Sequence, residues 1–388
     1  MTGNDLRELA RSASLHPVAG GAVVHLPATQ RLYALSTAAA LVWLDLRDEV
    51  PRSEIERTLA TELGIAPATA AEWVSQALSG FEASMVAAPE APARAALPRA
   101  TPGPELSQLG QDYILLDQRI RIAAPREAWT VINSVFGHLR APDRAESPPR
   151  LWIHVEARGA AFLISSSHDD PITVDAAGLA AEVERLIVQD GIPAVPHFLA
   201  FHAALLRRGT TAALLPAPSG SGKTSLAIAL AERGWAFLTD ELALLDRDLS
   251  WRGLPLPPCV KKDNWARIGG HHPQLAHAPP HHRFGRDVKF LDIPISQFRT
   301  ATEIVVFPQY QSNSGATTLR CMSPFDGLKA LLRQCVHVPP GFESGDLERL
   351  LHWHDGMRYM EMIFSDPWQA ADDMGSLIGP LAILPAPK

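Results

Sequence analysis

The sequence predicts an α/β protein in which a P-loop domain is preceded by a small α+β domain. A glycine-rich loop, "APSGSGKT", lies between an apolar strand-like segment and a helical segment, which is the order that a P-loop requires. A proline- and alanine-rich stretch divides the chain well before this loop. Ahead of that stretch, the hydrophobic pattern predicts two short strands followed by three helices.

Composition and charge exclude several classes of partner. The chain has 388 residues, 46% of them hydrophobic and 20% charged, with a formal net charge of −7. This length allows two or three domains, and the charge does not favour nucleic acid or a membrane surface as the main partner. The N-terminus has no apolar run of the signal-peptide kind, and no segment approaches the roughly 20 apolar residues of a membrane span. We therefore expect a cytoplasmic protein.

The three cysteines are far apart in the sequence. Cys259, Cys321 and Cys335 form no CxxC pair, so neither a disulfide framework nor a zinc knuckle is expected.

Residues 87–105, "AAPEAPARAALPRATPGPE", have little to bury and many residues that cannot continue a helix. We predict a domain at residues 1–88, a linker at 89–108 and a P-loop domain at 109–388 with its nucleotide core at about 195–375.

The N-terminal domain has a hairpin followed by three helices. The strands are "GAVVHLP" and "RLYALS", and the helices begin within "TAAALVWLDLRDEV", "RSEIERTLATELG" and "APATAAEWVSQALSG". Residues 16–88 resemble the PqqD-like family, a winged-helix module that recognises precursor peptides. The resemblance implies that a leader peptide adds as a strand to the sheet edge and packs on the last helix. The alternative is an ordinary winged-helix accessory or oligomerisation domain; the last helix has no Lys or Arg, unlike a DNA-recognition helix.

A lead-in region separates the linker from the P-loop. "DYILLDQRIRIAA", "LWIHVEARG" and "AAFLISSS" have strand character. "AAGLAAEVERLIVQDG" predicts an amphipathic helix with Leu179, Val183, Leu186 and Ile187 on its apolar side. We interpret this region as part of the nucleotide domain rather than as a separate catalytic unit.

The glycine-rich loop has the residues that bind a nucleoside triphosphate with Mg²⁺. Gly220 and Gly222 permit positive φ, so that backbone N–H groups and a helix N-terminus can surround a phosphate. Lys223 is placed to reach the β- and γ-phosphates, and Thr224 supplies a hydroxyl to Mg²⁺. The predicted nucleotide-binding residues are Ser219, Gly220, Ser221, Gly222, Lys223, Thr224 and Ser225.

Ala217 replaces the first glycine of the GxxxxGK[ST] pattern. A methyl group is tolerable there if φ is negative, and costs about 1 kcal/mol if φ is positive. We expect phosphate binding in either case.

Two acids follow the loop unusually soon. Asp240 and Glu241 lie at the end of the next predicted strand, seventeen positions after Lys223. A strand-end carboxylate there can approach both Mg²⁺ and the γ-phosphate, so one acid can bind the metal while the other accepts a hydroxyl proton. The alternative is that Asp240 caps a turn and Glu241 is solvated.

Over residues 195–375 the chain resembles HPr kinase/phosphorylase and the HprK-related kinases. The matching residues are "APSGSGKT", the acids of "TDE", and His202 in "FHAALLRRGTTAALLP". The resemblance implies a fold related to phosphoenolpyruvate carboxykinase and phosphorylation of a serine hydroxyl by ATP with Mg²⁺. It also implies His202 and Lys223 as catalytic residues, Asp240 as the base and Glu241 as a metal ligand, with the roles of the two acids open to exchange.

The chain departs from that family in two places. Glu241 stands where the bacterial HPr kinases have a second aspartate, although HprK-related kinases commonly have Asp-Glu. The "LEVRG"-type stretch associated with phosphorolysis is not recognisable. We therefore predict a kinase with little reverse phosphorylase activity.

Additional cations follow the acid pair. Lys261, Lys262, Arg286 and Lys289 lie in loops beside strands, where they could stabilise phosphoryl charge. Of these, Lys262 and Arg286 are the predicted phosphate ligands. The segment "GGHHPQLAHAPPHHRFG" has no zinc-ligand spacing, so we expect a mobile loop near the mouth of the site. The C-terminal part predicts a strand and helices that cover the sheet, without chemistry.

Two functional hypotheses remain open from the sequence. In the first, the protein is an ATP-dependent kinase for a serine or other hydroxyl of a ribosomally made precursor peptide that the N-terminal domain recruits. In the second, it is a nucleotide-binding regulatory or chaperone module whose winged helix binds a protein partner. The resemblance also allows a homo-oligomer, because hexamers occur in the kinase family. The acceptor residue and the choice between ATP and GTP are left open.

Overall fold

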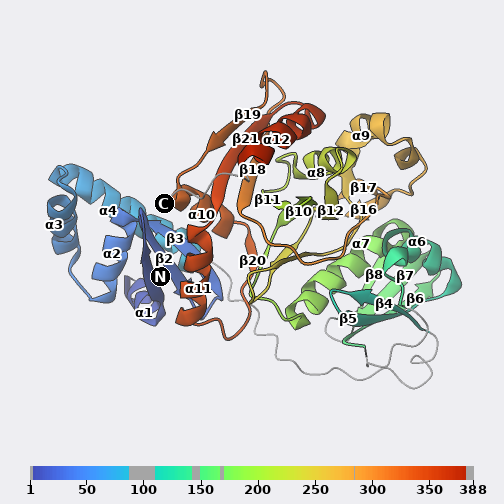
Figure 1. The fold of residues 1–388 in the computed structure, drawn as a ribbon. Helices are drawn as coiled ribbons and strands as arrows, with labels where there is room; N and C mark the ends of the chain where they lie inside the picture. Colours follow the sequence, from blue (N-terminus) through green and yellow to red (C-terminus); the bar gives the residue numbers. More distant parts are fainter. Residues whose placement is uncertain (1–2, 87–109, 142–148, 167–169, 284, 382–388) are drawn as a thin grey trace. The chain divides into compact units, whose positions relative to one another are not determined.

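The computed structural model describes residues 3–86, 110–141, 149–166, 170–283 and 285–381, and has a mixed α/β fold (Figure 1). Contacts divide the chain into two compact units. The described residues of the first are 3–86 and 320–360, and the second contains the remaining described residues. The predicted linker at 89–108 lies outside the described residues. Residues 320–360, which we assigned to the P-loop domain, group instead with the N-terminal residues.

The first unit contains a three-stranded antiparallel sheet of order β1-β2-β3. Both strands of the predicted hairpin are present, and a third strand precedes them. Gly20, with φ of +93°, makes the tight turn between the first two strands. The strands are β1 (Ser14–Val18), β2 (Gly21–Leu26) and β3 (Arg31–Ser36).

Helices surround this sheet, and each boundary has a local cause. The Ser36 side chain accepts a hydrogen bond from the Ala39 N–H and caps one helix, whereas Gly64, with φ of +61°, ends the next. Trp43 and Phe81 meet edge to face with centroids 5.0 Å apart in the core. The helices are α1 (Gly3–Ser12), α2 (Thr37–Arg47), α3 (Arg52–Leu63) and α4 (Pro67–Phe81), the last continuing as a π-helical turn (Glu82–Val86).

A distant segment of the chain completes the first unit. It contains α10 (Pro324–Leu332), β20 (Cys335–His337) and α11 (Ser344–Asp355). A Cβ atom at Gly21 would lie 2.7 Å from the Phe325 ring, so α10 packs closely on the start of β2. The His25 and Phe342 rings also meet edge to face, with centroids 5.0 Å apart. The N-terminal sheet therefore packs against residues that follow it by about 300 positions.

The second unit begins with the lead-in region as a five-stranded sheet of order β4-β5-β6-β7-β8. All of its neighbouring strands are antiparallel except β5 and β6. The Asp175 carboxylate caps α7 by accepting from the Gly178 N–H at 2.8 Å. The elements are β4 (Gly110–Leu115), β5 (Gln118–Ala123), α6 (Arg126–Phe136), β6 (Leu151–Arg158), β7 (Ala161–Ser166), β8 (Ile172–Asp175) and α7 (Ala176–Leu186).

A six-stranded sheet follows, of order β12-β10-β11-β18-β21-β19. The hairpin of β10 and β11 is antiparallel, whereas β11 and β18 are parallel. Helix α8 is buried and packs against α12. The boundary between the two units falls within β19 and β21. The elements are β10 (Ala203–Arg208), β11 (Thr211–Pro216), α8 (Lys223–Glu232), β12 (Ala236–Thr239), β18 (Ile304–Tyr310), β19 (Thr318–Cys321), β21 (Arg358–Phe364) and α12 (Pro367–Leu381).

Two smaller sheets complete the second unit. Strand β13 lies between β14 and β9 in one of them, and β17 lies between β15 and β16 in the other. The elements are β9 (Leu199–Phe201), β13 (Ala243–Leu245), β14 (Trp251–Gly253), β15 (Cys259–Lys261), α9 (Trp265–His271), β16 (His281–Arg283) and β17 (Arg286–Phe290). Within the part of the chain that the structure describes, no helix combines the length and apolar character needed to cross a membrane.

Candidate functional site

The loop at residues 217–224 connects β11 to α8 and has the shape that its glycines allow. Gly220 and Gly222 have φ values of +92° and +85°. A Cβ atom at Gly222 would lie 2.8 Å from the Phe364 ring, so both its conformation and its surroundings require glycine. The Ser221 carbonyl accepts from the Tyr310 N–H at 2.9 Å, which fastens the loop to the end of β18.

Ala217 fits this loop without backbone strain. Its side chain is buried. The non-glycine residues with positive φ in the described ranges are Gln30, Glu49, Leu116, Asp117 and Leu249. Ala217 therefore lies outside the left-handed region, and its methyl group carries no left-handed penalty.

Lys223 begins α8 with a buried ammonium group. The residue is 5% exposed, and among the described residues its Nζ atom has no hydrogen-bond partner. Burial lowers the pKa of Lys223 to about 8, while Glu241 and Asp240 act in the opposite direction. The neighbouring Ser221 hydroxyl is also buried, and it too has no hydrogen-bond partner in the described part of the chain. Such groups are costly to bury unless a ligand satisfies them, so the loop has the properties of an anion site.

The acid pair, Asp240 and Glu241, follows directly after β12. The Thr239 hydroxyl accepts hydrogen bonds from the Glu241 and Leu242 N–H groups at 3.2 and 3.3 Å, which holds the turn. Asp240 is 4% exposed and is hydrogen-bonded to the Thr224 side chain. The first turn of α8 and the end of β12 therefore meet at this bond.

The two acids have different electrostatic environments. Burial, followed by the charge of Glu241, raises the pKa of Asp240 to about 6, against the opposing effects of Thr224 and Lys223. Burial also acts to raise the pKa of Glu241, but the charges of Arg283 and Lys223 outweigh it and the net shift is downward. Glu241 is thus the more readily ionised acid, and Asp240 is the acid whose pKa suits proton transfer near neutral pH.

His202 lies between β9 and β10 and faces the same charges. Burial, followed by the charge of Lys223, lowers the pKa of His202 to about 4, and Arg283 and Lys261 act in the same direction. The imidazole is therefore neutral at pH 7. It can accept or donate a hydrogen bond, but it does not add a positive charge to the site.

The small sheet β15-β17-β16 supplies a cation to the loop, and this cation is Lys261. Its ammonium donates to the Ser219 hydroxyl. Lys262, one of the two predicted ligands, instead pairs with Asp287 at 2.7 Å on an exposed surface. Arg286 is exposed at the start of β17, and the contacts of the described residues bring neither Lys262 nor Arg286 to the loop.

Lys289, the fourth cation considered from the sequence, makes hydrogen bonds that hold the fold together. Its ammonium donates to the carbonyls of Leu275 and Ala276 at 2.9 and 3.0 Å. Those bonds hold the segment that follows α9. Lys289 is thereby engaged within its own part of the fold.

Sequence reasoning missed Arg283 and Glu184. The Arg283 guanidinium, on β16, lies 3.0 Å from a carboxyl oxygen of Glu241 and 3.0 Å from one of Glu184. Burial raises the pKa of Glu184 to about 8 against the opposing charge of Arg283, and Arg283 itself is held above its usual pKa by the two acids despite its burial. Arg283 also hydrogen-bonds the Cys259 thiol, whose pKa burial raises to about 12.

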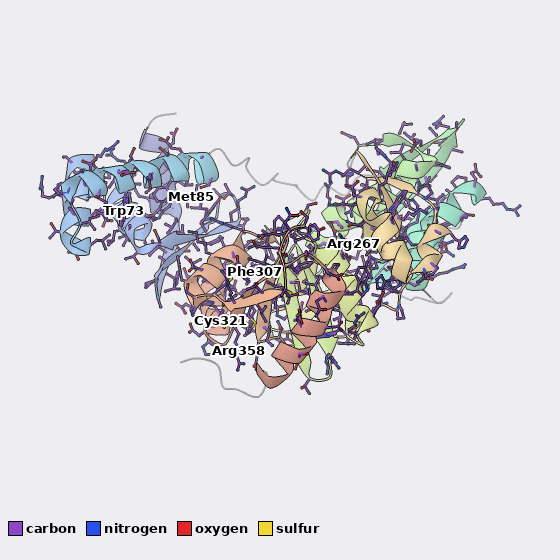
Figure 2. All side chains as sticks on the ribbon, turned by 90° about the horizontal axis from the view of Figure 1, so that it is seen from above. Trp73, Met85, Arg267, Phe307, Cys321 and Arg358 are labelled. Carbon is purple, nitrogen blue, oxygen red and sulfur yellow. The ribbon has the colours of Figure 1, made fainter. Side chains whose placement is uncertain are left out.

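Arg267 stands beside the same loop. Its guanidinium lies over the Tyr310 ring, 5.1 Å from the centroid, and donates to the Tyr310 hydroxyl at 3.0 Å. Figure 2 labels the position of Arg267. Because the Tyr310 N–H holds the Ser221 carbonyl, this cation is connected to the 217–224 loop through one residue. It belongs to α9, at the start of the histidine-rich segment.

The histidine-rich segment forms parts of α9 and β16, with a short turn between them. The His271 ring stacks on Trp368, with centroids 3.7 Å apart. In the described ranges, no group of three or more His, Cys, Asp or Glu side chains is arranged to hold a metal ion. Mg²⁺ does not need such a group, because one or two carboxylates with phosphate oxygens and water are its usual ligands.

The residues of the 217–224 loop and the acid pair fit a Mg²⁺–nucleotide. The Lys223 ammonium and the Ser221 hydroxyl, both buried without a hydrogen-bond partner among the described residues, favour a phosphate group at the loop. Thr224 and the acid pair provide the hard oxygen ligands that Mg²⁺ prefers.

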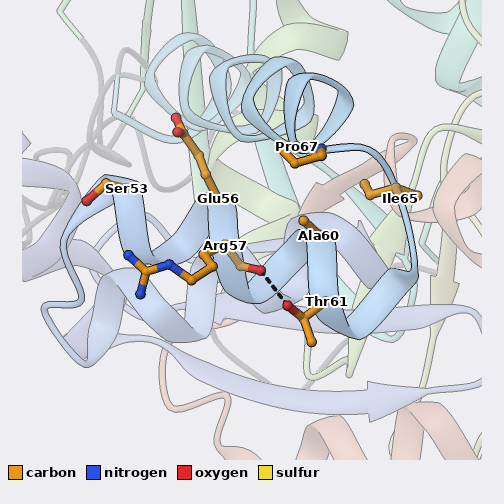
Figure 3. Close-up of a pocket in the computed structure, with 7 residues that line it drawn as sticks. All are labelled: Ser53, Glu56, Arg57, Ala60, Thr61, Ile65 and Pro67. Atoms are coloured by element: carbon orange, nitrogen blue, oxygen red, sulfur yellow. Dashed lines mark hydrogen bonds between the residues drawn. The ribbon is translucent and has the colours of Figure 1, made fainter.

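A separate surface hollow lies in the first unit between α3 and α4 (Figure 3). Its volume is about 440 Å³, and its lining includes Glu56, Arg57 and Thr61. The Thr61 hydroxyl donates to the Arg57 carbonyl within the helix. None of the residues predicted for catalysis or nucleotide binding lines this hollow.

No protein-family model matches this chain, and no curated protein has a significant match to it.

Proposed function

We propose that this protein is an ATP-dependent kinase that phosphorylates a hydroxyl group, with a serine of a ribosomally made precursor peptide as the acceptor. The observation that supports the proposal most strongly is the buried, unpartnered Lys223 ammonium beside a buried carboxyl group, Asp240, that is bonded to Thr224. A cation for the transferred phosphoryl and an acid suited to proton transfer are the two groups that such a reaction needs.

The 217–224 loop would hold the phosphates. Its backbone N–H groups and the N-terminus of α8 favour anion binding, and Lys223 and Lys261 add positive charge at the loop. Thr224 and Glu241 are the residues that would hold Mg²⁺, which, when bound, neutralises phosphate charge and polarises the γ-phosphoryl. The lowered pKa of Glu241 supports its role as the ionised ligand.

Asp240 would be the general base. The acceptor oxygen forms a bond to the γ-phosphorus while the bond between that phosphorus and the β,γ-bridging oxygen breaks, and the hydroxyl proton passes to the Asp240 carboxylate. A pKa of about 6 leaves this group mostly ionised at pH 7 yet basic enough to accept a proton. The neutral His202 imidazole would orient the acceptor or a phosphate oxygen by a hydrogen bond.

The order of elements supports a fold of the HPr kinase type. His202 precedes the β10–β11 hairpin, the 217–224 loop and α8 follow, and β12 ends at the acid pair. The charges of Lys223 and Glu241 both act on the pKa of His202, which supports a common site for the residues that the resemblance assigns to catalysis. We retain the proposal that reverse phosphorylase activity is low, since the associated sequence stretch is not recognisable.

The first unit supports a peptide as the acceptor. Its sheet has β2 in the centre, so β1 and β3 are the outer strands of the three. A peptide that pairs with an outer strand gains main-chain hydrogen bonds that do not depend on its sequence. This arrangement, together with the resemblance to the PqqD-like winged-helix family, is our reason for proposing a leader-bearing precursor rather than a small alcohol.

The test is intact-mass analysis of a precursor peptide encoded by a neighbouring gene, after incubation with the full-length protein and Mg-ATP. A mass gain of one or more phosphoryl groups with the parent protein, absent with Asp240→Asn, is the expected result. Tight nucleotide binding without transfer to any peptide would contradict the proposal and favour a nucleotide-dependent regulatory module.

A further inference from the structure

One nitrogen of Arg283 contacts two acidic side chains from different parts of the second unit. Its Nη2 atom lies 3.0 Å from Oε1 of Glu184 and 3.0 Å from Oε1 of Glu241. Glu184 belongs to α7 in the lead-in region, whereas Glu241 belongs to the acid pair. The Glu184 side chain is 2% exposed, and the Glu241 side chain is 31% exposed. Arg283 therefore connects a fully buried carboxyl group to one that faces the candidate site.

Glu184 is an unfavourable residue for packing alone. Its helical neighbours one turn away, Ala180 and Ile187, are both buried apolar residues. The second carboxyl oxygen of Glu184 is buried without a hydrogen-bond partner among the described residues. A buried acid with half of its hydrogen-bonding capacity unused costs free energy that an aliphatic side chain would not. Unlike an aliphatic residue, however, Glu184 can hold the Arg283 guanidinium.

Arg283 can restrain the orientation of the Glu241 side chain. Its guanidinium is planar and rigid, so contacts that fix its position also fix the Nη2 atom that Glu184 and Glu241 share. The anchors are Glu184 and the Cys259 thiol, which hold Arg283 from α7 and from β15. The Nη2 atom that lies beside Glu184 also donates to Glu241.

We propose that Glu184 is a positioning residue that acts through Arg283 to orient Glu241 for Mg²⁺–nucleotide binding. The inference rests on the proposed function only in assigning Glu241 to the metal-bound nucleotide. It extends the site beyond the loop and the acid pair into the lead-in region, which then has a part in nucleotide binding as well as in folding. Outer partners of this kind typically change metal affinity by about 10- to 100-fold when they are removed.

The test compares two substitutions at Glu184 in the full-length protein. Glu184→Gln keeps a carbonyl oxygen that can accept from Arg283, whereas Glu184→Leu keeps the volume and removes the acceptor. Glu182→Leu is the matched control, because Glu182 lies on the same helix and pairs with Arg185 at 2.6 Å instead. Titration calorimetry measures the affinity for β,γ-imido-ATP with Mg²⁺ and, separately, with EDTA, and thermal unfolding monitors folding.

We expect Glu184→Leu to weaken the Mg²⁺-dependent affinity by about tenfold or more, with no change in affinity in EDTA and with a cooperative thermal transition that shows the variant to be folded. Glu184→Gln should retain affinity within about threefold of the parent, as should Glu182→Leu. If Glu184→Leu does not fold, the unbranched Glu184→Met variant replaces it in the same comparison.

Three results would overturn the inference: parent-like Mg²⁺-dependent affinity in the acceptor-free variant, an equal loss of affinity in EDTA, or no nucleotide binding by the parent. Failure of the kinase proposal is recognised separately. A parent protein that binds the Mg²⁺–nucleotide with the expected Glu184 dependence, but phosphorylates no peptide, would leave the positioning role standing and remove the kinase function.

Discussion

The Thr224 side chain and the Asp240 carboxyl group are joined by a hydrogen bond. This bond links the first turn of α8 to the end of β12, so the two motifs predicted from the sequence meet in space. It lowers the pKa of Asp240, but burial and the charge of Glu241 outweigh it. The acid is therefore fixed in position and at the same time remains basic enough to take a proton.

Asp240→Asn should separate nucleotide binding from phosphoryl transfer. The amide oxygen can still accept from Thr224, so the geometry is kept while the proton acceptor is lost. We expect kcat for peptide phosphorylation to fall by about 10²- to 10⁴-fold, with nucleotide affinity within about threefold of the parent. Single-turnover assays and calorimetry measure the two quantities, and undiminished turnover by the variant would remove Asp240 from the role of base.

The pH dependence of transfer should report the same group. The base must be ionised, so kcat/KM for the acceptor should rise as the pH increases through about 6, where the pKa of Asp240 lies. The contribution of Asp240 to folding stability should instead fall as the pH rises, because its pKa in the folded protein is raised above the ordinary value of 3.8. The contribution of Asp240 to stability is complete below that ordinary value and is lost as the pH rises through about 6. A parent profile that is flat across this range would argue against the assignment.

Lys223→Met should make the nucleotide-free protein more stable and should weaken its binding of Mg-ATP. The ammonium is buried and has no hydrogen-bond partner within the described ranges. Replacing it with an apolar chain of similar length should raise the free energy of unfolding of the nucleotide-free protein by about 1 to 3 kcal/mol. The same variant should lose the thermal stabilisation that Mg-ATP gives to the parent. Urea unfolding and thermal shifts test both halves. A variant that is less stable than the parent would indicate that Lys223 has a structural partner in solution.

Lys261 and Lys262 provide a matched pair of substitutions. Lys261 donates to Ser219 on the 217–224 loop, whereas Lys262 pairs with Asp287 on an exposed surface. We expect Lys261→Met to raise KM for ATP by about tenfold, and Lys262→Met to change it by less than about twofold, because exposed ion pairs contribute little. The reverse ranking would restore Lys262 as the phosphate ligand predicted from the sequence.

The centre of the site was predictable because its residues are close together in the chain. Glycines at Gly220 and Gly222, followed by a helix and then a short strand, leave few ways to place the Asp240 carboxyl group other than near the start of α8. The choice between Lys261 and Lys262 was harder, because it depends on where β15 ends. The strand ends at Lys261, and the chain turns before Lys262.

Long-range partners could not be derived from local patterns. Glu184 and Arg283 are about a hundred positions apart, and no periodicity connects them. One signal was present: Glu184 follows Ala180 by four positions and precedes Ile187 by three, which places an acid on the apolar face of its helix. Likewise, the apolar pattern of residues 320–360 predicted that helices would cover a sheet, but not that this sheet would be the N-terminal one.

The composition of the first unit from residues 3–86 and 320–360 has a consequence for biosynthesis. The N-terminal strands and helices leave the ribosome well before α10 and α11 are translated, so Phe325 and its neighbours reach the start of β2 only late in synthesis. Until then, the surface that these helices cover is open to solvent and to chaperones. Residues 3–86 are therefore made well before residues 320–360 but reach their final packing only together with them.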